Sequence, residues 1–275
     1  MGRLAKTPAI EKQEMPMKNL NLSGFFFASL LACTTAFAQS QDRPNVVLML
    51  ADNLGFGDLS VYNGGTRGGM RTPNIDQLAE EGMRFTQFLV EPGCTPTRAA
   101  LQTGRYSIRS GLSLVIPPGR AGGLAAEEFT LGELFKSAGY NTAYMGKWHL
   151  GPNPENQPQN QGYDEWRLGF FGSTDSTLYE AHMNSVNAPQ EIIEAGASYI
   201  VEANGPGEVR QVRPYDREYR RQIEADIAEQ AVRYIERSAR EDEPFFLMLG
   251  WTRPHFPNDP APEFEGASGV GAYGD

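Results

Sequence analysis

The sequence has little cysteine, no basic stripe, and no apolar run long enough to span a bilayer. Two cysteines among 275 residues exclude a disulfide framework. A net charge of −10 without any cluster of Lys and Arg argues against a nucleic-acid partner or an anionic membrane surface. With 40% apolar and 21% charged residues, the composition is that of a globular protein. The length suits one large α/β domain or two small domains.

The N-terminal region has the pattern of a secretory signal. A short basic region precedes an apolar run at residues 25–31, and an Ala-x-Ala cleavage site follows at residues 36–38. We expect residues 17–38 to be a signal peptide, residues 1–16 to be an upstream extension, and the protein to be periplasmic or secreted. Lipidation at Cys33, as in a lipoprotein, is the alternative, and no integral membrane segment is expected.

The stretch from Cys94 to Gly104 places a cysteine at the start of a predicted helix. Pro96 is favoured in a first turn, and good helix formers follow as far as the stop at Gly104. A helix N-terminus favours negative charge, and Arg98 lies one turn after Cys94 on the same face. Once Cys33 leaves with the signal, Cys94 has no disulfide partner, which marks it as reactive or modified. An ordinary buried cysteine is the alternative.

Strand and helix patterns alternate along the chain, which predicts a largely parallel sheet with helices on both faces. Strands are expected at residues 45–50, 84–90, 142–145 and 244–249, and the first and last of these are expected to be fully buried. Helices are expected at residues 72–82, 94–103, 130–138 and 216–240.

Residues 152–215 are rich in Pro, Asn, Gln and Gly and have weak periodicity. We expect them to form a long loop over the substrate side of the site. Asp175, Tyr179 and His182 lie in this segment, either touching substrate or, as the composition favours, simply solvated. Residues 260–275 are also expected to be a loop.

Polar residues follow the predicted strands, at the edge of the sheet where α/β proteins bind ligands. These residues are Asp52, Asn53, Cys94, Lys147, His149 and His255. The adjacent oxygen donors of Asp52 and Asn53 suit a hard cation such as Ca²⁺ or Mg²⁺, with an Asx-rich turn as the alternative. Four independent placements at strand ends indicate one shared site.

In order along the chain, these segments resemble the sulfatase family of the alkaline-phosphatase-like superfamily. Residues 94–98, followed by Thr-Gly-Arg at 103–105, resemble the C-x-P-x-R signature and its tail. The other matching segments are residues 51–58, the first metal-binding segment; 72–76, the T-P-N-I-D helix start; 146–151, the G-K-W-H-L-G turn; and 254–255, the P-H pair. The resemblance covers residues 43–257 and implies an alkaline-phosphatase-like α/β fold.

This resemblance implies a sulfuric ester hydrolase of the arylsulfatase type. Cys94 would be oxidised to formylglycine by a formylglycine-generating enzyme, and one hydroxyl of the aldehyde hydrate would attack sulfur. A Ca²⁺ ion, or Mg²⁺, bound by Asp52, Asn53 and the modified Cys94 would activate that hydroxyl and polarise the sulfate. The implied substrate is a sulfated small molecule or carbohydrate.

The resemblance also assigns roles to four further residues. Arg98 and Lys147 would stabilise the sulfate oxygens and the hydrate oxyanion. His149 would hold or deprotonate the hydroxyl that does not attack. His255 would bind sulfate and protonate the leaving oxygen.

Two departures from the family pattern are present. Asn53 stands where many members have a second Asp, although its amide oxygen still suits a cation. Nothing after His255 matches the later Asp-Asn pair, the further Lys or the small C-terminal subdomain. Residues 43–275 are therefore expected to be the N-terminal portion of the catalytic domain. The alternatives are a phosphonate or phosphodiester hydrolase on the same site, or an inactive truncated fragment without the downstream metal ligands.

Overall fold

The computed structural model describes residues 43–63, 71–269, 271–272 and 274–275. The expected signal peptide, the upstream extension and Cys33 lie outside the described residues. The chain divides into two compact units, residues 1–43 and 44–275, and every described helix and strand belongs to the second unit. Among the described helices, none combines the length and the apolar character that a bilayer crossing requires.

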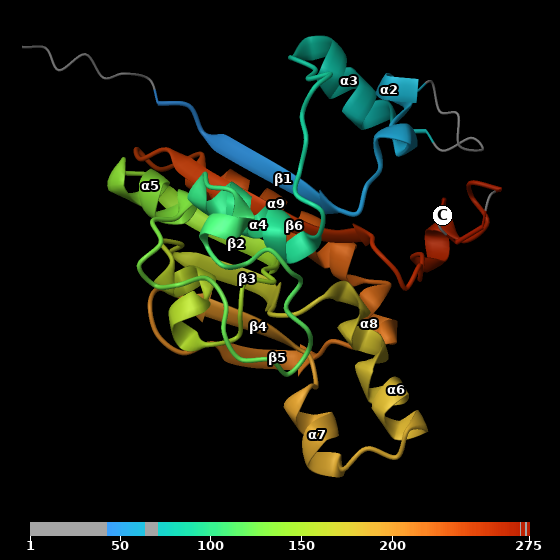
Figure 1. Cartoon of the computed structure of the whole chain (residues 1–275). Coiled ribbons are helices and arrows are strands. Elements are labelled where there is room, and N and C mark those ends of the chain that lie inside the picture. Colours follow the sequence, from blue (N-terminus) through green and yellow to red (C-terminus); the bar gives the residue numbers. More distant parts are fainter. Residues whose placement is uncertain (1–42, 64–70, 270, 273) are drawn as a thin grey trace, which may run out of the picture. The chain divides into compact units, whose positions relative to one another are not determined.

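A six-stranded sheet organises the second unit (Figure 1). Its strands are β1 (Val46–Asp52), β2 (Asn141–Lys147), β3 (Glu165–Phe170), β4 (Tyr199–Asn204), β5 (Arg210–Pro214) and β6 (Phe245–Pro254). The spatial order is β1-β6-β2-β3-β4-β5. The first four strands in this order run parallel, whereas β4 and β5 pair antiparallel. The expected α/β class with a mostly parallel sheet is confirmed.

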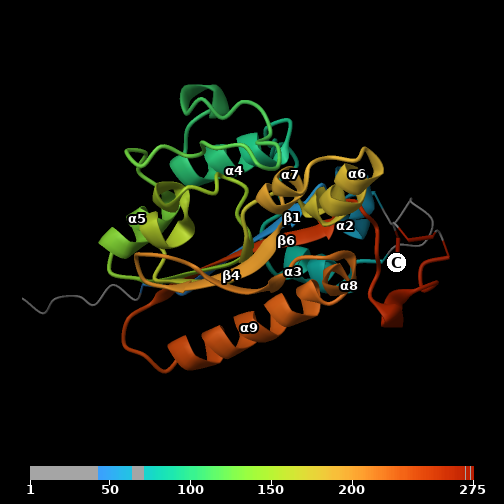
Figure 2. The same cartoon turned by 90° about the horizontal axis from the view of Figure 1, so that it is seen from below.

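The described helices are α2 (Ser60–Asn63), α3 (Pro73–Glu81), α4 (Cys94–Thr103), α5 (Leu131–Ser137), α6 (Tyr179–Ser185), α7 (Gln190–Ala195), α8 (Arg217–Arg220) and α9 (Ile223–Ser238). Some of them cover the two faces of the sheet. Figure 2 shows α9 on one side of the sheet and α4 with α5 on the other. Ile223 and Ile227 of α9 pack against Leu247 of β6, and Ala99 of α4 belongs to the core of the opposite face with Phe246.

The expectation of one long loop over residues 152–215 is wrong. This segment contains β3, β4, β5, α6 and α7, and its three strands extend the sheet. The strands are short, and every residue of β5 is exposed, so β5 has no apolar alternation for a sequence pattern to detect. β5 forms because it pairs with β4, and this pairing is a tertiary contact that local sequence does not reveal.

The strand expected at residues 84–90 is absent, and this described segment is irregular. It is attached to α2 and the residues beside it, because Arg84 donates to the Val61 carbonyl oxygen and Tyr62 donates to the Phe85 carbonyl oxygen. Cys94 therefore follows an irregular segment, and its predicted placement at a strand end was wrong.

The first predicted strand exists, but it is not fully buried. β1 lies at an edge of the described sheet and pairs only with β6 there. Val47 and Met49 are 41% and 56% exposed, while Leu48 between them packs against the core on the other face. β1 is therefore covered on one face, and the alternation in its exposure has the two-residue period of a half-buried strand.

The remaining helix predictions are confirmed with changes. The predicted helix at residues 216–240 is broken into α8 and α9 near Arg221. The predicted helix at residues 130–138 is α5, with the expected capping box between Thr130 and Glu133. Helix α3 forms where expected, but it has no buried residue.

Candidate active site

The start of α4 presents Cys94, as the sequence predicts. Gly93 precedes the helix at φ 147°, a conformation that side chains rarely adopt, and Gly104 ends it in the left-handed region at φ 65°. The hydroxyl of the buried Thr95 donates to the His149 carbonyl oxygen at 3.0 Å. The helix start is thereby fixed to the turn after β2, which carries further predicted site residues.

Asp52 at the end of β1 and Lys147 at the end of β2 form a buried ion pair. Lys147 Nζ lies 2.5 Å from Asp52 Oδ2, and the two side chains are 0% and 3% exposed. Burial alone would raise the pKa of Asp52, but the charges of Lys147 and Arg98 hold that pKa below its usual value. Burial lowers the pKa of Lys147, and the Asp52 carboxylate opposes this. The pair joins two strands that β6 separates in the sheet.

Arg98 is 2% exposed although its guanidinium is always charged. Its Nη1 donates to the Lys147 carbonyl oxygen at 2.6 Å and to the Tyr144 hydroxyl at 3.2 Å. Its Nη2 is buried and has no partner among the described residues. A buried donor without an acceptor costs about 1–3 kcal/mol. The guanidinium is therefore fixed on one side and able to bind an external acceptor, such as an anion, on the other.

His149 is buried in the turn after β2, where its φ is 57°. Its Nε2 lies 3.0 Å from the Ile116 carbonyl oxygen, and because a carbonyl only accepts, Nε2 carries the hydrogen. Burial, followed by the charge of Lys147, lowers the pKa of His149 to about 3, so the ring is neutral at pH 7. Its Nδ1 is then an acceptor, buried and without a partner among the described residues.

His255 follows the end of β6 and is held from both sides. Its Nδ1 lies 2.6 Å from the Phe256 carbonyl oxygen and so donates to it, while its Nε2 lies 3.4 Å from the Ser173 hydroxyl. The fully buried Arg220 donates to the His255 carbonyl oxygen at 2.7 Å and to the Thr252 hydroxyl at 2.6 Å. These contacts fix the backbone of the turn and the plane of the imidazole.

A cavity of about 160 Å³ brings together four of the predicted residues: Asp52, Asn53, Cys94 and Arg98. Lys147 adjoins them through its contacts with Asp52 and Arg98. His149 instead lines a separate cavity of about 340 Å³. His255 lies beside this group, because Pro254 before it pairs with Asp52 between β6 and β1, and its Nε2 faces Ser173 in the segment that follows β3.

That segment contains two residues that sequence reasoning missed. Ser173 faces His255, and the hydroxyl of Thr174 donates to Asp52 Oδ2 at 3.1 Å. Both side chains are buried. The signal was present, because two polar residues follow β3 after Phe171 and Gly172. It was missed because this part of the chain was expected to be a loop.

The other loop candidates make no described contact with the predicted site residues. The hydroxyl of Tyr179 donates to the Ile192 carbonyl oxygen at 3.1 Å, and His182 is exposed on α6. Asp175 is half-buried beside Thr174, without a described bond to the site. The interpretation of these three residues as substrate contacts stays a prediction.

The residues expected to hold a metal ion fit a hard cation in part. Asp52 and Asn53 offer oxygen donors on the wall that Cys94 also lines, and Asp52 Oδ1 accepts no hydrogen bond from the described residues. Ca²⁺ takes about six to eight oxygen ligands. The described residues contain no group of three or more His, Cys, Asp or Glu arranged to hold a metal. Asp52 and Asn53 therefore account for only part of a coordination sphere.

The mostly parallel α/β sheet carries a cysteine at a helix start beside a buried arginine and a buried ion pair, a combination that can bind an anion. The sequence model of one family, described as Sulfatase, matches residues 44–273. The chain belongs to the sulfatase family. Its resemblance to that family, and the fold that the resemblance implies, are confirmed.

Several known proteins are similar to this chain. Human arylsulfatase A (Homo sapiens) is 35% identical over 263 residues, which cover 90% of this chain and 48% of the relative. N-acetylgalactosamine-6-sulfatase of Canis lupus familiaris is 33% identical over 90% of this chain and 46% of its own length. The crystal structure of PsFucS1 sulfatase from Pseudoalteromonas sp. matches with a TM-score of 0.75 and 32% identity, covering 84% of this chain and 48% of that one. The chain thus spans about half the length of these proteins.

Proposed function

We propose that the protein hydrolyses sulfate esters at the site around Cys94. The observation that carries this proposal is the buried Arg98, which lines the cavity of Cys94 and keeps one guanidinium nitrogen without a partner among the described residues. A sulfate ester brings the anionic oxygens that such a donor requires. Relatives named as sulfatases support the same activity. Because the chain spans about half of their length, the proposal concerns the activity of the whole protein.

The reactive group in this proposal is a modified Cys94. A formylglycine-generating enzyme would convert Cys94 to formylglycine, whose hydrated aldehyde supplies the nucleophilic hydroxyl. Ca²⁺, or alternatively Mg²⁺, held by Asp52, Asn53 and the modified Cys94, would supply positive charge that polarises sulfate oxygens. Arg98 binds the sulfate oxygens through its Nη2.

Lys147 and the two histidines complete the proposed machinery. Lys147, fixed by Asp52, adds positive charge beside the sulfate oxygens. Neutral His149 accepts a hydrogen bond or a proton at Nδ1, because Nε2 is engaged with a backbone carbonyl. His255 has its Nδ1 engaged in the same way, so Nε2 is the nitrogen that binds sulfate and protonates the leaving oxygen.

The organic part of the ester would occupy the cavity of about 340 Å³ that His149 lines. Its wall combines apolar and aromatic side chains, such as Ile116 and Phe171, with the polar Tyr199 and Gln211. This mixture suits a sulfated small molecule or carbohydrate. One similar solved structure, that of Ps i-CgsB in complex with k-i-k-neocarrahexaose, is 27% identical and has a TM-score of 0.63.

Export belongs to the same proposal, because residues 17–38 have the pattern of a secretory signal. The protein would be periplasmic or secreted after cleavage following Ala38, with lipidation of Cys33 as the alternative. Mass determination of the N-terminal peptide of the mature protein distinguishes the two. A new N-terminus at Gln39 supports cleavage, whereas an acylated Cys33 supports the lipoprotein.

The substrate class is tested by comparing an aryl sulfate with an aryl phosphodiester. Sulfate and phosphate esters share tetrahedral anionic geometry, so the site geometry alone does not separate them. We expect a clear preference for the sulfate ester and a loss of about 10²–10³-fold in kcat for Arg98→Gln. Arg105→Gln is the matched control, because Arg105 is half-exposed and pairs with Glu128. A preference for the phosphodiester would refute sulfate ester hydrolysis.

A further inference from the structure

The Asp52 carboxylate is held through only one of its two oxygens. Oδ2 accepts Lys147 Nζ at 2.5 Å and Thr174 Oγ1 at 3.1 Å. Oδ1 accepts no hydrogen bond from the described residues, although Asp52 is 3% exposed. Asp52 also lines the cavity of Cys94 and Asn53. The described residues thus donate two hydrogen bonds to Oδ2 of Asp52 and none to Oδ1.

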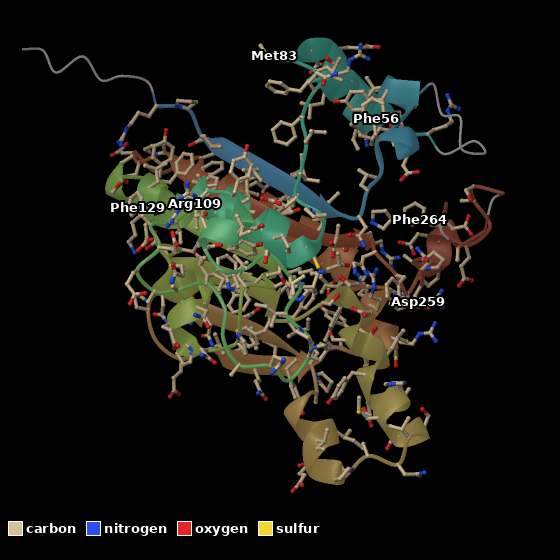
Figure 3. The ribbon with its side chains drawn as sticks, in the orientation of Figure 1. Phe56, Met83, Arg109, Phe129, Asp259 and Phe264 are labelled. Carbon is tan, nitrogen blue, oxygen red and sulfur yellow. The ribbon has the colours of Figure 1, made fainter. Side chains whose placement is uncertain are left out.

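The two donors to Oδ2 come from different elements. Lys147 ends β2, whereas Thr174 begins a short 3-10 helix, Thr174–Leu178, beyond β3. Both donor side chains are fully buried. Figure 3 shows the described side chains of the sheet and its helices as sticks. Rotating the carboxylate would break both bonds to Oδ2.

Lys147 alone does not determine the plane of this carboxylate. An ammonium group is a compact point charge on a flexible stem, so it neutralises Asp52 without fixing a rotamer. A threonine hydroxyl has a single proton, and its short β-branched side chain has restricted χ1 freedom. A second donor of this kind on the same oxygen restricts rotation of the carboxylate.

We propose that Thr174 is a positioning residue that holds Asp52 with Oδ1 directed to a divalent cation between Asp52, Asn53 and Cys94. This inference rests on the proposed function, because it assumes that a cation binds there. Hydrogen bonds from outside the coordination sphere orient ligating carboxylates, and losing one typically weakens metal binding about 10–100-fold.

Three variants of the full 275-residue chain test this role, with Ca²⁺ alone as the probe. Thr174→Val keeps the shape and removes the hydroxyl, while Thr174→Ser keeps the hydroxyl. Thr177→Val is the matched control. The Thr177 hydroxyl donates to the backbone carbonyl oxygen of Thr174 in the same 3-10 helix, so this variant also removes a hydroxyl but leaves the bond to Asp52 in place. Isothermal titration calorimetry gives the Ca²⁺ dissociation constant, and a crystal structure of each variant gives the orientation of the Asp52 carboxylate.

We expect Thr174→Val to weaken Ca²⁺ binding about 10–100-fold and to rotate the carboxylate, while Thr174→Ser and Thr177→Val stay within about threefold of wild type. Equal Ca²⁺ binding by wild type and Thr174→Val would overturn the role of Thr174 and leave the proposed function intact. Equal weakening in Thr174→Val and Thr174→Ser would overturn it as well. Absence of Ca²⁺ binding in the wild-type chain would overturn this inference together with the metal part of the proposed function.

Discussion

At the scale of single residues, the site consists of buried polar atoms, some of which have hydrogen-bond partners while others have none. Arg98 Nη2 and His149 Nδ1 are both buried without partners among the described residues, although most buried polar atoms in proteins have one. One is a donor and the other is an acceptor. An anionic oxygen of a ligand would satisfy Arg98 Nη2, and a hydroxyl donor would satisfy His149 Nδ1, so both atoms fit the roles proposed for them.

The depressed pKa of His149 predicts an acid-sensitive fold. In the unfolded chain the ring protonates below its ordinary pKa of 6.5, whereas in the folded chain it protonates only near pH 3. The stabilisation is therefore complete above pH 6.5 and is lost as the pH falls towards 3. His149 contributes a slope of up to about 1.4 kcal/mol per pH unit in this window.

Denaturant titrations of wild type and His149→Gln between pH 3 and 7 measure this contribution. Glutamine has no titratable group, so we expect a shallower loss of unfolding free energy in the variant. Other titrating groups are common to both chains and cancel in the difference. Identical pH slopes for the two chains would show that His149 is not held neutral by the fold.

At the scale of elements, sequence patterns succeeded where packing has a regular period. The spacing of Ile223, Ile227, Ala231 and Tyr234 predicts one apolar face, and all four are buried in α9. The capping box of α5 was equally readable. Patterns failed for β5, because this exposed strand has no apolar period. They also failed for residues 84–90, because this exposed apolar segment pairs with no strand among the described residues.

The structure brings Cys94, Arg98, Asp52 and Lys147 together. Sequence reasoning grouped these residues because helix starts and strand ends have readable signals, and their roles stay predictions. Thr174 was missed, since its role depends on a strand that only tertiary pairing reveals. The break between α8 and α9 was missed for a similar reason, because Arg220 is buried there by its contact with Thr252.

The close packing of β6 against the site predicts a strong effect at Gly250. A Cβ at this position would lie 2.5 Å from the Lys147 carbonyl oxygen and 3.1 Å from Arg98 Nη1. The methyl group of Gly250→Ala would therefore push both groups away from β6. We expect a loss of about 1–3 kcal/mol in unfolding free energy. Chemical denaturation measures it.

Gly172→Ala is the matched control for this change. A Cβ on Gly172 meets its nearest heavy atom, in Ser176, only at 3.9 Å, which is ordinary contact. We expect unfolding free energy close to that of wild type for this variant. A similar loss in both variants would argue against a specific constraint at Gly250.

At the scale of the whole molecule, the two faces of the sheet are not covered equally along its width. The sheet is covered around β2 and β6, whereas β1 exposes Val47 and Met49 on the face of the sheet that carries α9. Parallel strands are normally covered on both faces. The chain spans about half the length of its curated relatives, so the activity proposed above concerns the complete protein.

An exposed apolar edge strand predicts self-association of this chain. Val47→Lys places a charge on β1, and we expect it to lower the apparent molecular mass measured by light scattering at high protein concentration. Val232→Lys is the matched control, because Val232 is 54% exposed on α9, away from the sheet edge. Equal behaviour of the two variants would rule out β1 as the associating surface.

The central claim is that Cys94 is converted to the nucleophile and does not itself react as a thiol. Mass spectrometry of the tryptic peptide spanning residues 85–98, from protein produced with a formylglycine-generating enzyme, tests this most directly. We predict the mass change of a CH₂SH group converted to an aldehyde, and its absence from Cys94→Ala. A peptide that carries only unmodified cysteine would contradict the account, because the proposed nucleophile would then not exist.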